Sequence, residues 1–476
     1  MKESFGSFFI FMDGSFKSMD LGGIMFENTF KLKEHGVTAK SEFTAGLTTF
    51  VTMAYILAVN PQILSAAGMP AGGVLIATAL SSFIACICMA FLANLPFALA
   101  PGMGLNAYFT YGIVIGMGYS WQFALFAVFV EGVIFILLSL TNIREAIFNA
   151  IPMSLKQAIS CGIGLFIAFI GLQSAKLVSA NPATIVSFSK FNVGFHTQGI
   201  TALLAFIGVL LIAILTHRKV KGAILIGIFT SWVIGMIAQA AGLYLPNPEA
   251  GFFSLYPHWA APDFTSFGQI FAQCFKIDFS SVKLLDFMAI TFAFLFVDIF
   301  DTIGTLVGCA AKADLLDEEG KLPGAKGALL SDAIGTVVGA ICGTSTVTTY
   351  VESSAGVEAG GRTGLTALTA GLFFLVSIIL SPLFISIPAY ATASALIYVG
   401  FAMFTSVLRV DFSDLTEAIP AYVAILSMPM FYSIAEGISF GIVTYVIMKL
   451  FTGKKEQISP LMYFLAGVFI FRYIFM

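Results

Sequence analysis

Charged residues are scarce in this chain: Asp, Glu, Lys and Arg together make up 10% of it, whereas 58% of its residues are hydrophobic. A chain this apolar has too little polar surface for a soluble fold, so a water-soluble globular protein is excluded. Histidine is also rare, with four residues, and all four fall in expected loops or at the ends of apolar runs. A histidine proton relay or a haem site inside the apolar part of the protein therefore has no residues to form it.

Metal-ligand patterns and nucleotide-binding motifs are missing too. The six cysteines lie mostly inside apolar runs, without the spacing of metal ligands, and are interpreted as small buried hydrophobic residues. The glycine-rich stretch 360–364 lacks the lysine and the strand–loop–helix context of a phosphate-binding loop. No nucleophile with a histidine partner is found. The sequence therefore predicts neither an enzyme nor an ATP-driven pump: no catalytic residue, metal ligand, organic cofactor or nucleic-acid partner is expected.

Long apolar runs dominate what is present. A hydrocarbon core about 30 Å thick is crossed by an apolar helix of roughly 20 residues. Fourteen segments are counted as spans if the broken, more polar segment 344–361 is included, and a final run, 460–476, is barely long enough. An all-α, multi-pass protein of the cell membrane (plasma or inner membrane) is predicted, with the lipid bilayer as its surroundings. The other thirteen spans are 44–60, 74–93, 97–118, 122–141, 157–179, 198–216, 222–244, 285–311, 327–343, 365–386, 388–407, 416–432 and 434–450.

The placement of Lys and Arg predicts the orientation. Cytoplasmic connections of membrane proteins carry an excess of these residues. If the first span starts in the cytoplasm, 18 of the 23 Lys and Arg residues fall in cytoplasmic connections. The N-terminus is therefore expected to be cytoplasmic.

One segment in each half of the chain is interrupted. Seven spans precede the long aromatic- and proline-rich stretch 245–283, and seven follow it. An odd number per half means that the second half, if homologous, is inserted upside down, as in inverted-repeat transporters. The third span is broken by Pro101 and neighbouring glycines, and the tenth by the Thr- and Ser-rich stretch 343–356. The chain is thus predicted to be built from 7+7 inverted repeats.

These two breaks indicate a binding site. Backbone that leaves helical form within a bilayer must be buried in protein or line a cavity. Residues 98–105 and 346–351 are expected to run extended, to pair as short strands, and to be followed by helices whose N-termini face the bound molecule. A carboxylate is costly at membrane depth, so Glu352 is a candidate functional residue. Asn106, at the other break, is a second candidate because its amide can both donate and accept hydrogen bonds. The alternative is two kinked helices packed through glycines.

The eighth span carries a polar stripe. Asp298, Asp301, Thr302 and Thr305 are spaced so that they share one helix face, which must face a cavity or a partner helix rather than lipid. The stripe could instead be interhelical hydrogen bonding that only holds the bundle together.

Two further acids are harder to assign. Asp332 opens the ninth span and either caps that helix or hydrogen-bonds to the site. Glu131 sits inside the fourth span without a polar stripe and is interpreted as a neutral, hydrogen-bonded structural acid.

Together these residues resemble a known family along essentially the whole chain. The most specific matches are 100–107, 300–305 and 348–353. The chain resembles the AzgA-like adenine/guanine/hypoxanthine permeases of the nucleobase–cation symporter (nucleobase–ascorbate transporter) superfamily. The resemblance implies a core domain (spans 1–4 and 8–11) that holds the substrate and a gate domain (spans 5–7 and 12–14), with the third and tenth segments paired as short β-strands. It also suggests a homodimer formed through the gate domain.

This resemblance divides the chain into a cytoplasmic N-terminal segment 1–43, core domain 44–141, gate domain 142–244, extracellular linker 245–284, core domain 285–386, gate domain 387–452, and a C-terminal tail 453–476 with the short apolar segment.

The resemblance also implies the site. Asp301 and Glu352 would contact the nucleobase, with the Val351 amide and Tyr350 nearby, and Asn106 and Asp332 would complete the set. Related uracil carriers have a Glu in place of Asp301 and a His in place of Thr305, so the pattern favours a purine. The secondary candidates are Asp298, Thr302 and Ser353.

The resulting hypothesis is import of purine nucleobases with protons by alternating access. Two carboxylates in a dehydrated site repel each other, so a proton that enters with the substrate would couple the two fluxes. Asp301 is hypothesised to carry the proton and Glu352 to anchor the purine, with Asp332 as a further proton-coupling candidate. The alternatives are a purine uniporter or channel-like facilitator and an inorganic-anion transporter of the same architecture. The sequence does not reveal which purine is accepted.

Overall fold

The structure is a computed structural model of the chain. It describes residues 7–8, 19–20, 27, 29–140, 151–257, 259–277, 282–313, 315–316 and 322–475. The predicted domain boundary at residues 141 and 142 and most of the predicted N-terminal segment lie outside these residues.

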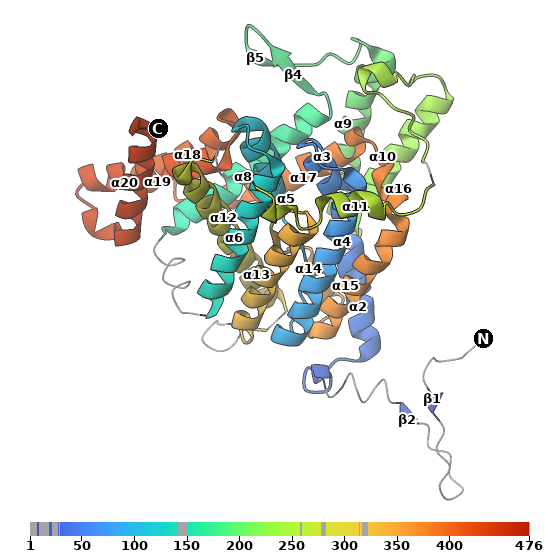
Figure 1. Cartoon of the computed structure of the whole chain (residues 1–476), viewed down its shortest axis with the longest axis horizontal. Coiled ribbons are helices and arrows are strands. Elements are labelled where there is room, and N and C mark those ends of the chain that lie inside the picture. The colour runs from blue at the N-terminus through green and yellow to red at the C-terminus, as the bar shows by residue number, and fades with distance from the viewer. Residues whose placement is uncertain are drawn as a thin grey trace, which may run out of the picture.

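Helices make up most of the described chain (Figure 1). Eleven of them are long and apolar enough to cross a membrane, which confirms a mostly helical, multi-pass membrane protein. These eleven are α2 (Ala39–Met53) with α3 (Ile56–Ser65), α4 (Ala71–Cys88) with η1 (Met89–Ala93), α6 (Trp121–Leu140), α8 (Met153–Ser174), η3 (Phe195–Gly199) with α9 (Ile200–His217), α10 (Ala223–Ala240), α12 (Leu284–Lys312), α13 (Ala325–Cys342), α15 (Gly364–Ser377) with η7 (Ile378–Leu380) and α16 (Ser381–Ile385), α17 (Ala389–Phe404) with η8 (Thr405–Arg409), and α19 (Ile434–Phe451). Two shorter apolar helices are α18 (Leu415–Met430) and α20 (Pro460–Phe475).

The start of α2 is fixed by local capping. Thr38 and Ser41 form a reciprocal cap at the start of α2, where the backbone N–H of Ser41 donates to Thr38 Oγ1 at 3.1 Å. Glu42 in the same helix is fully buried, and both of its carboxylate oxygens accept hydrogen bonds from the start of α15. Because a helix N-terminus leaves backbone donors unpaired, this buried carboxylate is stabilised by the helix that it caps.

The two interrupted segments meet in the interior. Strand β3 (Leu99–Pro101) pairs antiparallel with β6 (Val347–Thr349), and Ala100 lies opposite Thr348. Backbone bonds extend the pair at both ends, from Gly102 N to Thr346 O and from Tyr350 N to Ala98 O, each 3.0 Å long. The backbone groups of both breaks are therefore satisfied within the protein.

Each of these strands is followed by short helices. Beyond β3 come α5 (Met103–Ala107) and the π-helix η2 (Tyr108–Gly116), and beyond β6 comes α14 (Ser353–Glu358). Two other strand pairs lie apart from the breaks: β1 (Ser7–Phe8) with β2 (Met19–Asp20), and β4 (Val178–Asn181) with β5 (Ile185–Phe188). The stretch between α10 and α12 holds η4 (Pro248–Ala250), α11 (Phe264–Ile270) and η5 (Gln273–Phe275), and η9 (Lys455–Gln457) lies between α19 and α20.

The helices pack in two groups. Helix α13 packs against α6 and α4, and α15 packs against α2 and α4. In the second group, α17 packs against α8 and α9, while α18 packs against α8 and α19. Helices α8 and α17 cross so closely that a Cβ atom on Gly164 would lie 2.6 Å from the carbonyl oxygen of Gly400. Glycine at this position therefore permits the close crossing. Helix α14 packs against α2 of the first group. In Figure 1, α18, α19 and α20 lie together at one side.

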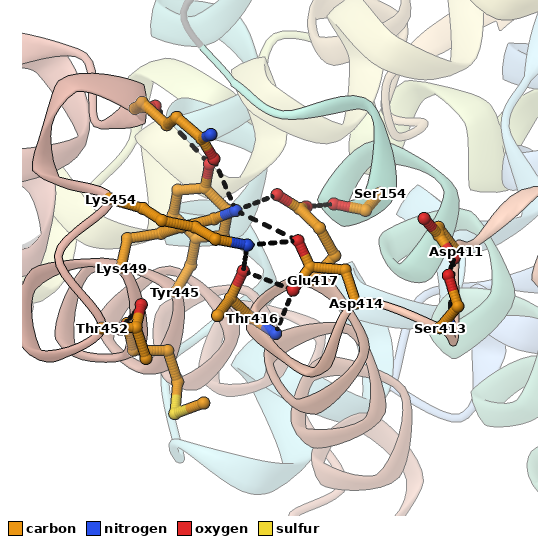
Figure 2. Close-up of polar contacts among 12 residues, drawn as sticks. Ser154, Asp411, Ser413, Asp414, Thr416, Glu417, Tyr445, Lys449, Thr452 and Lys454 are labelled. Carbon is orange, nitrogen blue, oxygen red and sulfur yellow. Dashed lines mark hydrogen bonds and ion pairs between the residues drawn. The ribbon is translucent and has the colours of Figure 1, made fainter.

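A polar network holds one end of the second group together (Figure 2). The ammonium of Lys449 at the end of α19 lies 2.6 Å from Glu417 Oε1 on α18, and Ser154 at the start of α8 donates to the same carboxylate. Lys454 donates to Asp414 Oδ2 at 2.7 Å. This bond, with those from Thr416, lowers the pKa of Asp414 below its ordinary value. Three helices are thereby tied to one another by charge.

The C-terminal helix α20 packs against α19 and ties it to α12. Arg472 Nη1 lies 2.9 Å from Glu436 Oε1 on α19, and its Nε lies 3.6 Å from Asp286 Oδ1 on α12. These three side chains border an open cavity of about 390 Å³ together with Tyr119 and Lys283.

Candidate functional site

Tyr350 stands directly after β6 and is fixed to β3. Its backbone N–H donates to Ala98 O at 3.0 Å, and its hydroxyl donates to Pro101 O at 2.6 Å. The side chain is buried. Tyr350 is therefore held at the crossing of the two broken segments by both its main chain and its side chain.

Glu352 lies at the start of α14, two residues beyond Tyr350. Its Oε1 accepts a hydrogen bond of 2.6 Å from the hydroxyl of Tyr55. Tyr55 is buried at the junction between α2 and α3, where the first span is interrupted after Met53. A hydroxyl bond to a carboxylate is charge-assisted, so this contact fixes the direction in which the carboxylate points.

Asp301 of α12 faces the same place. Its carboxyl lies close enough to that of Glu352 for the two to repel each other when both are ionised. Both carboxyls also interact electrostatically with the hydroxyls of Tyr55 and Tyr350. The structure thus brings together three residues predicted for substrate binding, Asp301, Glu352 and Tyr350. Sequence reasoning missed the fourth, Tyr55, because nothing in the apolar run around it marks the interruption of the helix.

The surface next to these acids is open. The Val351 side chain is 58% exposed although it lies between the buried Tyr350 and the start of α14. Gly304, one turn beyond Asp301, is also exposed, and a Cβ atom there would meet nothing within 4 Å. Thr305, the other predicted substrate contact on α12, is buried.

Asn106 and Ser353 form hydrogen bonds between the two broken segments. The Asn106 carbonyl accepts from Ser345 Oγ, and its amide donates to Pro101 O at 3.5 Å. The Ser353 hydroxyl accepts from Ala98 N at 3.0 Å. Both side chains therefore fasten one broken segment to the other.

A second group of acids lies behind the strands. Asp298 and Thr302 of α12 meet Asp332 of α13, with Thr302 Oγ1 2.8 Å from Asp332 Oδ2. Thr302 Oγ1 is also 2.8 Å from Thr348 Oγ1 of β6. Helix α13 begins after Gly324, so the interpretation of Asp332 as its cap is wrong, and the alternative of bonds near the site is the one observed.

Glu131 of α6 belongs to this second group. Its Oε2 accepts from Thr346 Oγ1 at 3.3 Å, and its carboxyl is within hydrogen-bonding reach of Asp298. The group of acids does not have the arrangement of a metal site: among the described residues no cluster of three or more His, Cys, Asp or Glu side chains could hold a metal ion.

The fold and the site together define a multi-pass membrane transport protein. It has helices long enough to cross a membrane, two broken segments that meet as paired strands, and acids gathered where those strands cross. The family model described as "Permease family" (Xan_ur_permease) matches residues 40–440, and the chain belongs to this family.

Named relatives agree with this membership. The chain is 41% identical to the adenine permease AdeP of Escherichia coli, over 95% of this chain and 96% of that protein. It is 42% identical to the guanine/hypoxanthine permease PbuG of Bacillus subtilis, over 94% of this chain and 99% of that protein. The relatives are permeases and not enzymes, as the sequence predicted.

A solved structure shares the fold. The transmembrane domain of the cyanobacterial bicarbonate transporter BicA superposes with a TM-score of 0.61 at 16% identity, covering 84% of this chain and 97% of that one. At this identity the likeness concerns the fold alone.

Proposed function

We propose that the protein imports purine nucleobases across the cell membrane together with protons, by alternating access. The observation that carries this proposal is the gathering of Asp301, Glu352, Tyr55 and Tyr350 beside the strand crossing. The adenine and guanine/hypoxanthine permeases among the relatives support a purine as the substrate.

The chemistry of the site suits a purine edge. A purine presents ring N–H donors and ring-nitrogen acceptors in one plane. An ionised carboxylate accepts from such N–H groups, whereas a protonated carboxyl donates to a ring nitrogen. Hydrogen bonds to charged groups contribute about 1.5–3 kcal/mol each, so Glu352 and Asp301 together can account for selective binding of a small, flat molecule.

The proposed architecture has fourteen membrane segments in two inverted halves. The eleven long helices, α18 and the two broken segments supply that number. Spans 1–4 and 8–11 form the core domain that carries the site, and spans 5–7 and 12–14 form the gate domain. The N-terminus lies in the cytoplasm, and a homodimer forms through the gate domain.

An anion substrate fits the site less well. The fold is shared with a bicarbonate transporter, but the groups that meet here are two carboxyls and two phenols. Carboxylates repel an anion, whereas they attract the N–H groups of a neutral nucleobase. Three acids are predicted for proton coupling. Asp301 and Glu352 lie in the proposed purine site, and Asp332 is connected to it through Thr302 and Thr349.

Uptake by the purified protein in proteoliposomes tests the function. Radiolabelled hypoxanthine is offered under an inward pH gradient of about one unit, which drives about tenfold accumulation at one proton per purine. We expect accumulation that a protonophore abolishes and that guanine or adenine, but not uracil, competes with. Uptake that only equilibrates hypoxanthine would support a uniporter, and competition by bicarbonate or sulfate alone would support an anion carrier.

A further inference from the structure

Glu131 and Asp298 form a buried pair of acids in which one oxygen of each carboxyl has no hydrogen-bond donor among the described residues. Both side chains are fully buried, on α6 and α12, and their carboxyls are within hydrogen-bonding reach of each other. Glu131 Oε1 and Asp298 Oδ2 accept a hydrogen bond from no donor group of any described residue. Neither acid belongs to the ion pairs found between described residues.

The donors near the pair are already used. Thr302 has one hydroxyl proton, and its short contact of 2.8 Å is with Asp332 Oδ2, whereas Asp298 Oδ1 is 3.4 Å away. Thr346 reaches Glu131 Oε2 at 3.3 Å, which is a long hydrogen bond for a hydroxyl donor. Two ionised carboxylates in this position would each be buried without adequate donors, at a cost of several kcal/mol per ion.

Glu42 is a buried carboxyl group in this protein that is well supplied with hydrogen-bond donors. It is equally buried, yet its Oε1 accepts from Arg362 N at 2.8 Å and its Oε2 from Thr366 Oγ1 at 2.6 Å. The contrast with Glu131 and Asp298 lies in the supply of donors rather than in burial. A proton shared between the two carboxyls supplies the missing donor, because a protonated carboxyl donates to an ionised one.

We infer that Glu131 and Asp298 share one proton and that this pair, rather than the substrate-binding Asp301, carries the transported proton. The inference rests on the proposed proton-coupled purine transport and assigns its proton site. In the transport cycle the pair takes up a proton from outside as an O–H bond on one carboxyl and releases it to the cytoplasm. Both acids are then ionised until the next proton arrives.

The pair is connected to the substrate site through the polar side chains of the tenth segment. Thr346 bonds to Glu131, Thr348 contacts Thr302, and Thr349 donates to Asp332 Oδ1 at 3.4 Å. The same segment continues directly into Tyr350 and Glu352. Loss of the proton makes both carboxyls negative and so changes the hydrogen bonds of these threonines. A shift of the threonines moves Tyr350 and Glu352, which follow directly in the chain.

Among the described residues, the other titratable groups that interact electrostatically with the pair are acids. Asp332 on α13 acts on both members, and Asp301, one turn along α12, acts on Asp298. A negative surrounding favours a proton on the pair and makes its release depend on the state of Asp332 and Asp301.

The decisive variant is Glu131→Gln in the full-length protein in proteoliposomes. Exchange of hypoxanthine at equal pH reports purine binding and alternation, whereas accumulation under a pH gradient and acidification of the lumen report proton movement. We expect exchange to stay within about threefold of the wild type, and the roughly tenfold accumulation and the acidification to be lost. Glu249→Gln, at an exposed position of η4, is the matched control and is expected to behave as the wild type.

Three results would overturn the inference. These are gradient-driven accumulation by Glu131→Gln at the wild-type level, accumulation that requires a sodium rather than a proton gradient, and net uptake of hypoxanthine by the wild type without acidification of the lumen. Absence of hypoxanthine exchange in the wild type would instead refute the proposed function, so the two failures are distinguishable.

Asp298→Asn and an infrared measurement keep the inference testable if Glu131→Gln does not fold. Asp298→Asn is expected to show the same loss of accumulation with retained exchange. In the wild type at neutral pH, the C=O stretching band of a protonated carboxyl is expected, and it should shift when purine is added. Absence of that band in folded wild-type protein would overturn the shared proton irrespective of any variant.

Discussion

The hydroxyl of Tyr55 donates to Oε1 of Glu352 at 2.6 Å, across an interval of 297 residues. Tyr55 stands where the first span is interrupted between α2 and α3, and Glu352 stands where the tenth segment resumes as α14. An interruption in one segment therefore supplies the donor that orients the acid at the interruption in another. Thr52, one turn before Tyr55, also approaches the Glu352 carbonyl at 3.5 Å.

Tyr55→Phe tests this relationship. Removal of the hydroxyl leaves Glu352 without its charge-assisted donor, a loss of about 1.5–3 kcal/mol, so the apparent affinity for purine should fall about 10- to 100-fold. The measurement is the KM for hypoxanthine in proteoliposomes. Tyr398→Phe, on α17 and away from this acid, is the control and should keep the wild-type KM. An unchanged KM for Tyr55→Phe would mean that the bond does not orient the binding acid.

Gly343→Ala should destabilise the fold at the start of the tenth segment. Gly343 has φ of +98°, and a Cβ atom there would lie 2.7 Å from Ile270 Cγ1. The backbone conformation costs an L-residue about 1–2 kcal/mol, and overpacking adds about 1–3 kcal/mol. The apparent unfolding temperature in detergent measures the effect. Gly453→Ala has a similar φ of +77° but nothing within 4 Å of its added Cβ, so it isolates the backbone cost and should lower that temperature less.

Much of the position of the site could be predicted from sequence because the signals are local. Pro101 and the Thr- and Ser-rich stretch 343–356 interrupt apolar runs, and Asp301 and Glu352 stand at or opposite those interruptions. Tyr55 could not be predicted in this way, since the helix breaks after Met53 without a proline or glycine. Its role appears only when the first and tenth segments lie side by side.

Glu131 shows the same limit. Its own span has no polar stripe, and the acid that it meets, Asp298, lies in the other half of the chain. For Asp332 the sequence alone does not decide between a helix cap and a contact near the site. The reason is that α13 begins after Gly324, eight residues earlier, whose left-handed backbone the following residues do not indicate. Pairings between distant segments are set by packing, which periodicity within one segment does not report.

Lys449→Met should destabilise the helix group shown in Figure 2. The Lys449 side chain is 1% exposed, and it neutralises Glu417 while also donating to Gln457 Oε1 at 2.7 Å. Lys449 is buried, but the Glu417 side chain is 20% exposed, so removing the lysine costs about 1–3 kcal/mol, less than for a fully buried pair. The unfolding temperature should fall, and the double variant Lys449→Met/Glu417→Leu should recover most of the loss. Lys455→Met, at an exposed position, should change little.

Asp414 contributes a pH-dependent part of the same network. Its hydrogen bonds from Lys454 and Thr416 lower its pKa from the ordinary value of 3.8, so its ionised form is favoured by folding. A group with a lowered folded pKa stabilises the fold above its unfolded pKa, and that stability is lost as pH falls through the folded value. Asp414→Asn should therefore lower the unfolding temperature at neutral pH, and the difference from the wild type should shrink below about pH 4. A constant difference down to strongly acid pH would show that the charge of Asp414 does not contribute.

Arg472→Gln should loosen the contact between α12 and α19. Arg472 pairs with Asp286 at 3.6 Å and with Glu436 at 2.9 Å, and in the proposed architecture these acids belong to the core and gate domains. A partly exposed pair contributes about 1 kcal/mol, so removing it should raise the population in which the two helices separate about fivefold. Thiol labelling of a cysteine placed at Met117, which lines the adjoining cavity, measures that separation. Labelling should accelerate in Arg472→Gln but not in Arg409→Gln, whose arginine lies exposed at the end of η8. Equal labelling rates in both variants would mean that α20 stabilises the fold without influencing the movement of the core against the gate.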